Sequence, residues 1–411
     1  MDKERCHVRI GVVGLGYVGL VTAAVLANRG NSVVGVDVDV SRIQTLKSGK
    51  SPIFEPELDD RIRSARGNLE FSEDYSELSD CKVIFIGVPT PNIGNRIDLK
   101  YVLAAAAEIK KYSPSSDLVI KSTVLPGTAR KVTELTGMNV VSNPEFTREG
   151  SAVHDTEKPD RIVIGGKSVE NVRKIWEFTG SPIIVTTNEN AELIKYASNA
   201  FLAVKISFIN QIADLCEKIP GTDVNVVADG MGLDRRIGKE FLKAGLGYGG
   251  SCFPKDNVAI SSFANEKGVD LSIVNSAIQY NDKRVPFLVE RMKDNLDTLD
   301  GKSVCVLGLS FKDNTDDLRE SRSLVIIESL KKQGANVRAY DPVVHYIGGI
   351  DLCDDLSKCI LDADIVITAT EWGEFSKIDP SILRGKKVFD LRRVLDPNKV
   401  ELTMGVGIGK N

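Results

Sequence analysis

Between residue 8 and about residue 190, short runs rich in β-branched residues alternate with segments of helical periodicity. Six runs are expected to be buried parallel strands: residues 8–14, 32–38, 82–88, 117–123, 138–144 and 161–166. Two of the intervening segments, residues 18–29 and 99–111, have the pattern of crossover helices. Few folds permit this alternation, and it predicts a doubly wound α/β domain.

A glycine-rich turn, GLGYVG, follows the first of these strands and opens the first helix. In such a turn Gly14 permits the tight bend, Gly16 lets the backbone approach a pyrophosphate, and Gly19 permits close helix–sheet packing. The next strand ends at Asp37, about 20 residues on, where a carboxylate can accept both ribose hydroxyls and would repel the 2′-phosphate of NADP. The alternative is a glycine turn without a ligand. Strand context together with Asp37 favours NAD binding.

The periodicity changes at residues 191–219, where apolar residues recur at helical spacing. We expect one long helix there, suited to link two domains or to form a dimer interface, with more helical pattern to about residue 290. A second alternation predicts the strands of a smaller Rossmann-like domain at residues 301–311, 335–342, 362–370 and 386–393. Its glycine cluster, VLGLSF, lacks the third glycine and favours a mononucleotide or nucleotide-sugar site. The end of the chain, ELTMGVGIGKN, is expected to be a loose tail.

Composition and charge limit the classes of function. The chain has 53 basic and 57 acidic residues and a formal net charge of −4, which gives no support for a general nucleic-acid-binding surface. No apolar stretch approaches the roughly 20 residues that span a bilayer, and the first residues lack a signal-peptide cleavage pattern. The seven cysteines are scattered without a CxxC pair and there are three histidines, so we expect neither a disulfide framework nor a metal centre. Reduced thiols in a cytoplasmic protein are therefore expected.

Polar side chains gather where two predicted strands end, at the edge where open α/β sheets bind ligands. KSTVLPG contains Thr123, and NPEFTREG contains Glu145 and Glu149. They could face a nicotinamide and a substrate, although threonine is more often a turn former and glutamate more often solvated. On the long helix, Lys195 and Asn199 are four residues apart beside the apolar stripe. They could bind an oxyanion or a water, and the plainer interpretation is an exposed polar flank.

The stretch GYGGSCFPKD, residues 247–256, places Cys252 after a run of glycines. Glycine opposes both helix and strand, so we expect a tight loop in which backbone amides can approach a ligand closely. Cysteine is usually a small buried hydrophobe. In a polar, glycine-lined loop with Lys255 nearby, a reactive thiolate is an equally good interpretation, and these residues alone leave both open.

Taken together, these segments resemble the UDP-glucose/GDP-mannose dehydrogenase family of nucleotide-sugar 6-dehydrogenases. The matching stretches follow the family's order: GLGYVGL, VPTP, KSTVLPGT, NPEFTREG, AELIKYASNAFLA, RRIGKEFLKAGLGYGGSCFPKD, GLSFKDNTDDLRES and VFDLRRVL. The resemblance implies an α/β architecture of two Rossmann-like doubly wound domains joined by a long central helix. It implies an NAD-binding domain at 1–190, a helical dimerisation region with the cysteine loop at 191–290, and a UDP-sugar-binding domain at 291–411.

The same resemblance implies oxidation of the C6 alcohol of a nucleotide sugar to a carboxylate, with two NAD per turnover. GGSCFPKD and FLKAGLGYGG are similar to the branch of the family that acts on UDP-glucose, so UDP-glucose is the expected substrate and UDP-glucuronate the product. GDP-mannose and a UDP-N-acetylhexosamine are the alternative substrates. The family likeness also implies a homodimer. The cysteine and histidine content predicts a cytoplasmic protein without a metal ion, and no partnership with nucleic acid or membrane is expected.

Catalytic roles carry over from the family residue by residue. Cys252 is the implied nucleophile, which captures the aldehyde as a thiohemiacetal and then carries a thioester that water hydrolyses. Lys195 is implied to stabilise the oxyanion of the covalent steps. Asp256 and Thr123 are implied to hold the water that takes part in proton transfer, which Asn199 positions.

Binding roles carry over in the same way. Glu145 is implied to assist thioester hydrolysis and, with Phe146, to contact the substrate. Arg236 matches an arginine that reaches the sugar nucleotide from the neighbouring subunit. The other implied substrate contacts are Lys195, Asn199, Phe241, Leu242, Lys243, Tyr248, Gly249, Lys312 and Arg392. The implied cofactor contacts are Gly14, Gly16, Tyr17, Val18, Gly19, Asp37, Arg42, Thr90, Thr123, Glu149 and Arg319.

Overall fold

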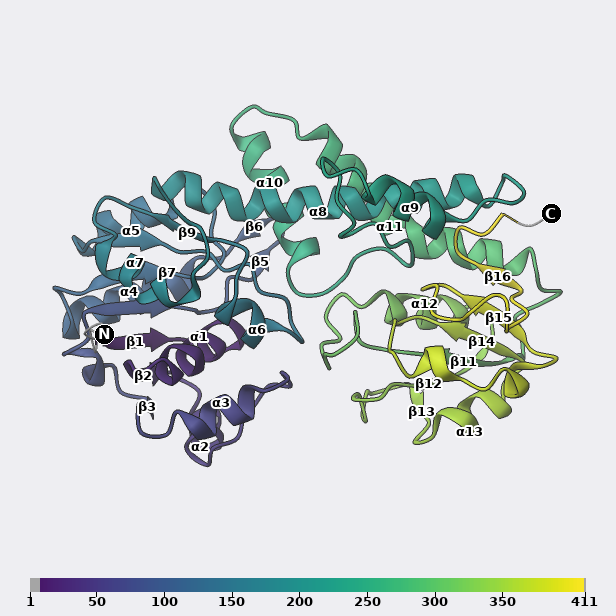
Figure 1. Cartoon of the computed structure of the whole chain (residues 1–411), viewed down its shortest axis with the longest axis horizontal. Helices are drawn as coiled ribbons and strands as arrows, with labels where there is room; N and C mark the ends of the chain where they lie inside the picture. The colour runs from purple at the N-terminus through teal and green to yellow at the C-terminus, as the bar shows by residue number, and fades with distance from the viewer. Residues whose placement is uncertain (1–7, 410–411) are drawn as a thin grey trace. The chain divides into compact units, whose positions relative to one another are not determined.

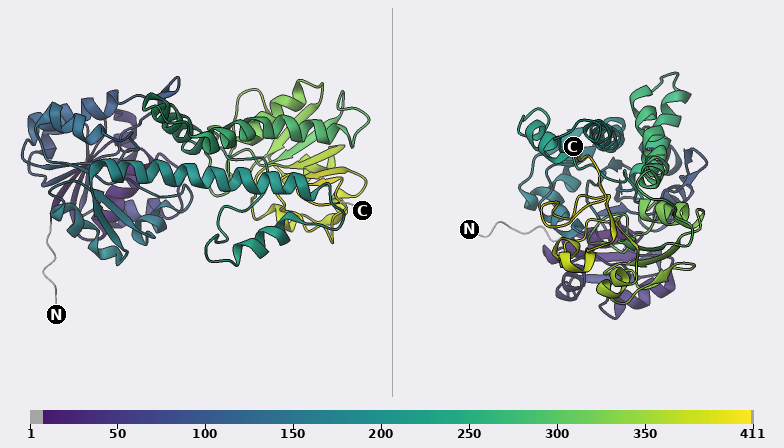
Figure 2. Two further views of the ribbon diagram at one scale, coloured as in Figure 1. Left: turned by 90° about the horizontal axis from the view of Figure 1, so that it is seen from above. Right: turned by 90° about the vertical axis from the view of Figure 1, so that its right-hand side faces the viewer.

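The computed structural model describes residues 8–409 of the chain, which divides into two compact units, Met1–Ser198 and Asn199–Asn411 (Figure 1). The first residues, expected to lack a signal-peptide pattern, lie outside the described range. The predicted long helix is α8 (Asn188–Cys216), which continues without a break from the end of the first unit into the second (Figure 2). Among the helices of residues 8–409, none combines the length and the apolar character that a bilayer span requires.

The first unit contains an eight-stranded sheet of order β10-β9-β8-β7-β4-β1-β2-β3. Its strands are β1 (Arg9–Val13), β2 (Ser32–Val36), β3 (Leu69–Ser72), β4 (Val83–Ile86), β7 (Asp117–Ile120), β8 (Val140–Ser142), β9 (Ile162–Gly165) and β10 (Ile183–Thr186). The described pairs are parallel except that β9 runs antiparallel to β8. The prediction that residues 161–166 form a parallel strand is therefore wrong in direction, because a run of β-branched residues favours a strand without setting its direction. Strands β3 and β10 were not predicted.

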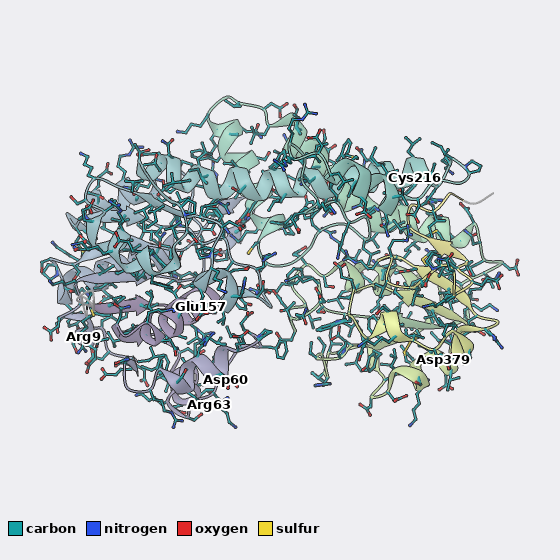
Figure 3. The ribbon with its side chains drawn as sticks, viewed as in Figure 1. Arg9, Asp60, Arg63, Glu157, Cys216 and Asp379 are labelled. Atoms are coloured by element: carbon teal, nitrogen blue, oxygen red, sulfur yellow. A yellow bond between two sulfur atoms is a disulfide. The ribbon has the colours of Figure 1, made fainter. Side chains whose placement is uncertain are left out.

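Helices cover both faces of this sheet. One face is packed by α1 (Tyr17–Asn28), α2 (Val40–Lys47), α3 (Leu58–Ser64), α6 (Ala152–Glu157) and α7 (Glu170–Trp176). The other is packed by α4 (Lys100–Tyr112), α5 (Thr128–Thr136) and the 3-10 turn η1 (Tyr75–Leu78). On the first face Arg61 of α3 pairs with Glu157 of α6 at 3.2 Å. Figure 3 labels Glu157 and, below it in that view, Asp60 and Arg63 of α3. A second 3-10 turn, η2 (Glu177–Thr179), and a small hairpin, β5 (Asn92–Ile93) with β6 (Arg96–Ile97), complete the unit. The doubly wound prediction is confirmed.

The second unit contains a six-stranded parallel sheet of order β13-β12-β11-β14-β15-β16. Its strands are β11 (Ser303–Leu307), β12 (Asn336–Tyr340), β13 (Asp351–Leu352), β14 (Ile365–Thr368), β15 (Lys387–Asp390) and β16 (Met404–Gly405). One face packs against α8, α9 (Val224–Gly232), α11 (Ser272–Lys293) and α12 (Arg322–Lys331). The other packs against α13 (Leu356–Leu361), η3 (Phe375–Lys377) and η4 (Pro380–Leu383), and α10 (Phe253–Glu266) follows the cysteine loop. The second Rossmann-like unit is thus confirmed.

The end of the described chain is docked rather than loose. Residues 404–405 add strand β16 to the sheet, and Met404 and Val406 are buried in the core of the second unit. The amide of Gly407 donates to a carboxylate oxygen of Glu217 at 2.7 Å. The prediction of a loose tail is therefore wrong for these residues, because two alternating apolar side chains are enough to anchor a short edge strand.

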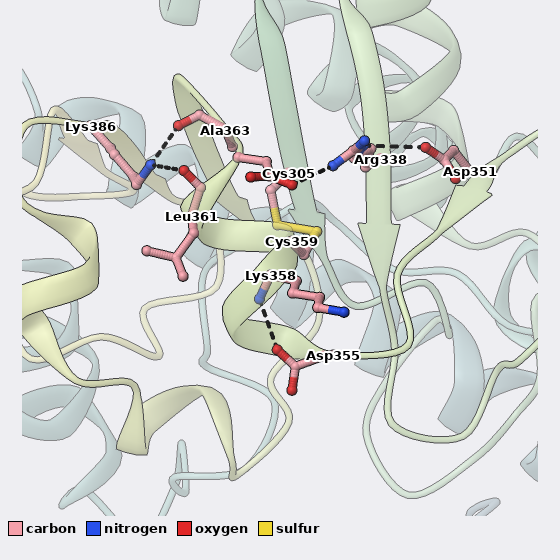
Figure 4. The surroundings of a disulfide bond; sticks show 10 residues. Cys305, Arg338, Asp351, Asp355, Lys358, Cys359, Leu361, Ala363 and Lys386 are labelled. Atoms are coloured by element: carbon pink, nitrogen blue, oxygen red, sulfur yellow. Dashed lines mark hydrogen bonds and ion pairs between the residues drawn. A yellow bond between two sulfur atoms is a disulfide. The ribbon is translucent and has the colours of Figure 1, made fainter.

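A disulfide joins Cys305 of β11 to Cys359 of α13, and both residues are fully buried (Figure 4). The expectation that the chain contains only reduced thiols is wrong for this pair. The two cysteines are 54 residues apart, so their spacing carries no signal, and it is the packing of α13 on the sheet that brings them together. The free cysteines of the described residues are Cys81, Cys216, Cys252 and Cys353.

Candidate active site

The turn after β1 has the geometry of a dinucleotide site. Gly14 has a positive φ of 87°, and a β-carbon on Gly19 would overlap the carbonyl oxygen of Gly14. A β-carbon on Gly16 would meet no atom within 4 Å, so the backbone there faces open space. Gly14 and Gly19 thus serve the bend and the helix packing that the sequence predicted, and the open space at Gly16 leaves room for the predicted approach of a phosphate. Tyr17 and Val18 follow in the first turn of α1, where free amides favour a pyrophosphate.

Asp37 is buried at the end of the next strand, and its carboxylate is held in place from three sides. It accepts the amides of Leu15 at 2.7 Å and Asp39 at 2.9 Å. It also accepts the Arg42 guanidinium at 2.8 Å, so two of the predicted cofactor residues lie together. A carboxylate fixed in this way at the end of β2 is suited to a ribose.

Loops from four strand ends meet at the same edge of the first sheet. The hydroxyl of Thr90, after β4, donates to the carbonyl of Thr123, after β7, at 2.9 Å. The amide of Gly150, beside Glu149 and after β8, donates to the hydroxyl of Tyr17 at 2.8 Å. One contact thus joins the loops after β4 and β7, and the other joins the start of α1 to the loop after β8, all at the edge where the parallel strands end.

Lys195 and Glu145 form a buried ion pair of 2.9 Å in the first unit. The second oxygen of Glu145 accepts the amide of Thr147 at 2.7 Å and its hydroxyl at 2.6 Å. Burial opposes ionisation, but Lys195 and Thr147 outweigh it and hold the pKa of Glu145 below its ordinary value. Neither the solvated glutamate nor the exposed polar flank is therefore the correct interpretation here.

Phe146 lies beside this pair, with its ring 5.5 Å from the Lys195 ammonium and 3.8 Å from the Arg161 guanidinium. Arg161 immediately precedes β9, and the reversed direction of that strand brings its beginning to the ligand edge. Sequence reasoning had no signal for Arg161, because a parallel β9 would have placed it at the opposite edge.

Sequence reasoning also missed Lys121, a buried lysine in KSTVLPG. Its ammonium lies 3.5 Å from the side-chain oxygen of Asn143 and 4.6 Å from the ring centre of Trp176. Burial lowers the pKa of Lys121 to about 8; the charge of Glu145 raises it and that of Lys195 lowers it further. The signal available was a lysine at the end of a buried strand.

In the second unit, Cys252 is exposed and lies at the N-terminus of α10. Its exposure excludes the packed-thiol alternative, and its place at a helix N-terminus supports the reactive one. One turn into the helix lies buried Asp256. Its carboxylate accepts hydrogen bonds from the side-chain amide of Asn199 at 2.7 Å and from the ammonium of Lys255 at 2.6 Å. The structure therefore joins the predicted pair Asn199 and Asp256.

The glycines of the cysteine loop make room for the protein itself. A β-carbon on Gly249 would overlap the carbonyl oxygen of Glu320, and one on Gly250 would lie 2.7 Å from the ring of Phe311. The amide of Gly250 donates to the carbonyl of Arg319 at 3.1 Å. The sequence predicted that the backbone of these glycines lies close to a ligand. In the structure it lies close to the segment that follows β11.

Tyr248 and the residues before it are largely built into the unit. Asn281 accepts the amide of Tyr248 at 2.8 Å, and Arg322 donates to its carbonyl at 2.8 Å. Burial raises the pKa of Tyr248 to about 12, so the phenol stays protonated. Leu242 is buried, and the Phe241 ring lies 6.1 Å from that of Phe253, the residue after Cys252.

A cluster of charged side chains forms at the carboxyl ends of β11, β14 and β15. Lys243 pairs with Glu371 at 3.1 Å, and half-buried Arg392 donates to the carbonyl of Ala369 at 3.0 Å. Burial lowers the pKa of Arg392, and Glu371 opposes that shift. Burial and Glu371 raise the pKa of Asp313, while Lys312 and Lys243 lower it. The predicted contacts Lys243, Lys312 and Arg392 thus share one electrostatic environment.

Sequence reasoning missed Asp313 and Glu371, although each follows a predicted strand within a few residues. Arg236 and Arg319 are exposed, and each forms a bidentate pair with the aspartate two residues earlier, at 2.6 and 2.7 Å. Neither pair is with another predicted site residue.

Comparison with known proteins now identifies the fold and its parts. Residues 8–178 match the NAD-binding domain of the UDP-glucose/GDP-mannose dehydrogenase family, residues 189–283 its central domain, and residues 305–397 its UDP-binding domain. The chain belongs to this family. The resemblance, the oxidoreductase class and NAD as the cofactor are thereby confirmed.

Individual relatives within the UDP-glucose/GDP-mannose dehydrogenase family cover almost the whole chain. The UDP-glucose 6-dehydrogenase of Rhizobium meliloti (strain 1021) is 40% identical, covering 95% of this chain and 97% of that protein. The solved structure of a UDP-glucose dehydrogenase from Pyrobaculum islandicum is 37% identical with a TM-score of 0.93 and covers 100% of both chains. That of a UDP-D-ManNAc dehydrogenase from Pyrococcus horikoshii is 29% identical with a TM-score of 0.88, covering 98% of this chain and 100% of that chain.

Proposed function

We propose that the chain oxidises UDP-glucose to UDP-glucuronate with two NAD per turnover. The observation that carries the proposal is an exposed cysteine, Cys252, at a helix N-terminus with the buried Asn199–Asp256 pair one turn away. A dehydrogenase that removes only two electrons has no use for such a nucleophile, whereas a four-electron oxidation needs to retain the aldehyde between its two steps. Relatives named UDP-glucose 6-dehydrogenase at about 40% identity support the choice of sugar.

NAD, when bound, accepts one hydride in each of the two oxidations. In the first, the C6 alcohol loses a hydride and a proton to become an aldehyde. The Cys252 thiolate adds to the aldehyde carbon, and Lys195 stabilises the oxyanion of the thiohemiacetal. Loss of the second hydride leaves a thioester. Water then adds, the C–S bond breaks, and the carboxylate and the free thiol are released.

The remaining polar groups are assigned to proton transfer. Asp256 accepts protons through a water that it shares with Thr123 and that Asn199 positions. Glu145 assists the hydrolytic water, and its ionised state in the pair with Lys195 suits a base. Each of these assignments rests on the family resemblance together with the burial and pairing of the side chain.

The binding assignments follow the three domains that the family resemblance implies: an NAD-binding domain at 1–190, a helical dimerisation region at 191–290 and a UDP-sugar-binding domain at 291–411. The turn at Gly16, fixed Asp37, and the loops with Thr90 and Glu149 form the proposed NAD site. The cations Lys243, Lys312 and Arg392, at the carboxyl ends of the second sheet, form the proposed site for the diphosphate and the sugar, because cations suit such groups.

We also propose a homodimer in the cytoplasm. Phe201, Phe208 and Leu215 of α8 are exposed at 64%, 45% and 55% and recur every seven residues, which places them on one side of the helix. A second copy of the chain is the proposed cover for them, with Arg236 reaching the partner's substrate. An exposed thiol such as Cys252 stays reduced in the cytoplasm, whereas the Cys305–Cys359 disulfide is fully buried and so is shielded from the reductants of that compartment. Light scattering should give a dimer, and Phe208→Glu should shift it towards monomer.

The decisive experiment is the NADH yield per sugar across UDP-glucose, GDP-mannose and UDP-N-acetylmannosamine. The proposal expects a ratio near two with UDP-glucose and poor turnover of the others. One NADH per UDP-glucose, or none, would contradict it. Better turnover of another sugar would move the substrate assignment and leave the thioester chemistry standing.

Cys252→Ser tests the nucleophile. Turnover should be lost while UDP-glucose still binds, because only the covalent steps need sulfur. Cys353→Ser is the matched control, since Cys353 is another free thiol of the second unit and should leave turnover unchanged. In the wild type, an alkylating reagent should modify Cys252 and UDP-glucose should protect it, while Cys81 and Cys216 are buried.

A further inference from the structure

Glu192 is a buried carboxylate near the start of α8 to which neither the sequence nor the proposed mechanism assigns a role. It is 3% exposed. One of its oxygens accepts the amide of Gly127 at 2.6 Å, and the other accepts the amide of Ala129 at 2.8 Å. The second oxygen also accepts the hydroxyl of Ser142 at 3.2 Å. A single side chain of α8 thus holds the loop after β7 and the end of β8.

These contacts replace a missing local cap. Helix α5 begins after Gly127, which has no side chain to cap the free amides, so a carboxylate from a distant helix takes that place. One turn earlier in α8, Asn188 accepts the amide of Ser142 at 2.9 Å and donates to the carbonyl of Val140 at 3.1 Å. The first turns of α8 are therefore fixed to both segments through hydrogen bonds.

Glu192 also lies beside two residues of the proposed chemistry. It lines a cavity of about 10 Å³ together with Lys195, Thr123, Ser122 and Ser142. Lys195 is three residues further along α8, hence on the same side of the helix, and Thr123 belongs to the loop that ends at Gly127. Moving Glu192 away from the loop amides would therefore shift Lys195 relative to Thr123.

We propose that Glu192 is a positioning residue for the oxidation, which fixes the Lys195 ammonium relative to the Thr123 hydroxyl by clamping the loop after β7 onto α8. The inference rests on the roles proposed above for Lys195 and Thr123. Small displacements of groups that act in the transition state lower turnover far more than they weaken substrate binding.

A glutamine cannot reproduce the clamp. Both carboxylate oxygens of Glu192 accept backbone amides, so the side-chain amide in Glu192→Gln would turn an N–H towards one donor and leave that donor without an acceptor. Burial raises the pKa of Glu192 to about 7, although its three donors favour the charged form. Assays at about pH 8.5 keep the carboxylate ionised in the wild type.

Glu55 offers a matched comparison in the same unit. It too is a buried carboxylate that caps two amides, those of Gly150 at 2.6 Å and Ala152 at 2.7 Å, at the start of α6. That loop carries Glu149, a proposed cofactor contact. Loss of either cap removes a similar set of hydrogen bonds, so a purely structural role would give the two variants the same kinetic behaviour.

The test measures kcat and the KM values for NAD and sugar in Glu192→Gln, Glu55→Gln and Asp117→Asn. Glu192→Gln should lower kcat about tenfold with both KM values within about twofold. Glu55→Gln should raise the KM for NAD about fivefold with little change in kcat. Asp117→Asn, at the amino end of β7 where it accepts the amides of Asn139 and Asn171, should leave all three parameters unchanged.

Hydrogen exchange gives a second readout that needs no turnover. The backbone amide hydrogens of peptides spanning residues 122–129 should exchange faster in Glu192→Gln than in the wild type. In Asp117→Asn they should exchange at the wild-type rate. If Glu192→Gln does not fold, Ser142→Ala, which removes only one donor, should still lower kcat about twofold. An unchanged kcat, or equal changes in kcat and KM for both glutamine variants, would overturn the inference. A wild type that oxidises no nucleotide sugar would contradict the proposed function, and the exchange data would still decide whether Glu192 holds the loop.

Discussion

The two units repeat one local design at their first strands and use it differently. After β1 the chain reads GLG and after β11 it reads GLS, and each turn is tied to an aspartate at the end of the neighbouring strand. The amide of Leu15 donates to Asp37 at 2.7 Å, and the amide of Leu309 donates to Asp341 at 2.7 Å. The backbone arrangement at this point is therefore the same in the two units.

The two aspartates differ in what else they bind. Besides the amides of Leu15 and Asp39, Asp37 accepts Arg42, a side chain that is a third exposed. Asp341 also accepts the amides of Ser310, Val343 and Val344 and the indole of Trp372, at 3.0–3.3 Å. Asp341 therefore holds its own loops through more donors than Asp37 does, which agrees with the proposed role of Asp37 in the NAD site. A shared Rossmann turn thus says little about ligand binding until the protein donors to its aspartate are counted.

The largest effect should come from the packing glycine that the second turn lacks. Gly19→Ala would force a β-carbon onto the carbonyl of Gly14, so we expect a loss of more than about 4 kcal/mol in the unfolding free energy of the first unit, and no NAD binding. Gly16→Ala, which meets no atom within 4 Å, should fold normally and bind NAD weakly. Urea unfolding followed by NAD titration checks both, and normal stability of Gly19→Ala would contradict the packing argument.

The disulfide is a covalent difference between the two units, since the described part of the first unit contains no disulfide. A bridge between residues 54 apart should stabilise the second unit by about 4 kcal/mol through the unfolded chain. Reductant, or Cys359→Ala, should therefore lower the unfolding midpoint of the second unit alone. The chain has two tryptophans, Trp176 in the first unit and Trp372 in the second, so replacing either by Phe leaves a fluorescence probe of the other. An equal shift at both probes would contradict the assignment.

A titratable buried amine distinguishes the first unit. The pKa of Lys121 is lowered from 10.5 to about 8 by burial, so below about pH 8 the folded chain bears the cost of a buried charge. Above pH 10.5 the amine is neutral in both states and the cost disappears. The unfolding free energy of the wild type relative to Lys121→Met should thus rise by about 3 kcal/mol between pH 7 and pH 10.5. Lys131→Met, at an exposed site of α5, is the control and should show no such trend.

The smallest effect tests the aspartates directly. Asp341→Asn should cost the second unit about 2 kcal/mol, because an amide group would face two or more backbone donors. Asp37→Asn should cost the first unit less and should raise the KM for NAD about tenfold. If Asp341→Asn raised that KM as much and Asp37→Asn did not, the division of labour between the turns would be wrong.

Much of the fold was predictable because runs of β-branched residues, turn glycines and helical periodicity are typical of α/β units. The direction of β9 was not predictable, because a run of β-branched residues favours a strand equally in either orientation within the sheet. The disulfide was not, because the contact of β11 with α13 depends on the sheet order. The docking of Met404 and Val406 was hidden by a glycine-rich ending, in which two alternating apolar residues make a weak pattern.

The candidate site was predictable where a motif places a side chain at a strand end, as with Thr123, Glu145 and Asp37. It was not predictable for three residues that contact other parts of the protein. Glu192 and Glu55 accept backbone amides, and Lys121 contacts other buried side chains. A glutamate in a helical run resembles a solvated residue, and only the packing shows that its carboxylate faces inward. Supporting residues of this kind depend on tertiary contacts that no local pattern records.

The reversal of β9 has a practical consequence for protein engineering. Mutant libraries for α/β enzymes usually sample the segments that follow strands, since those reach the ligand edge. Here the segment before β9 reaches it as well, and Arg161 stacks on Phe146 at 3.8 Å. A library meant to alter sugar selectivity should therefore randomise residues 158–161 along with the segments after the parallel strands.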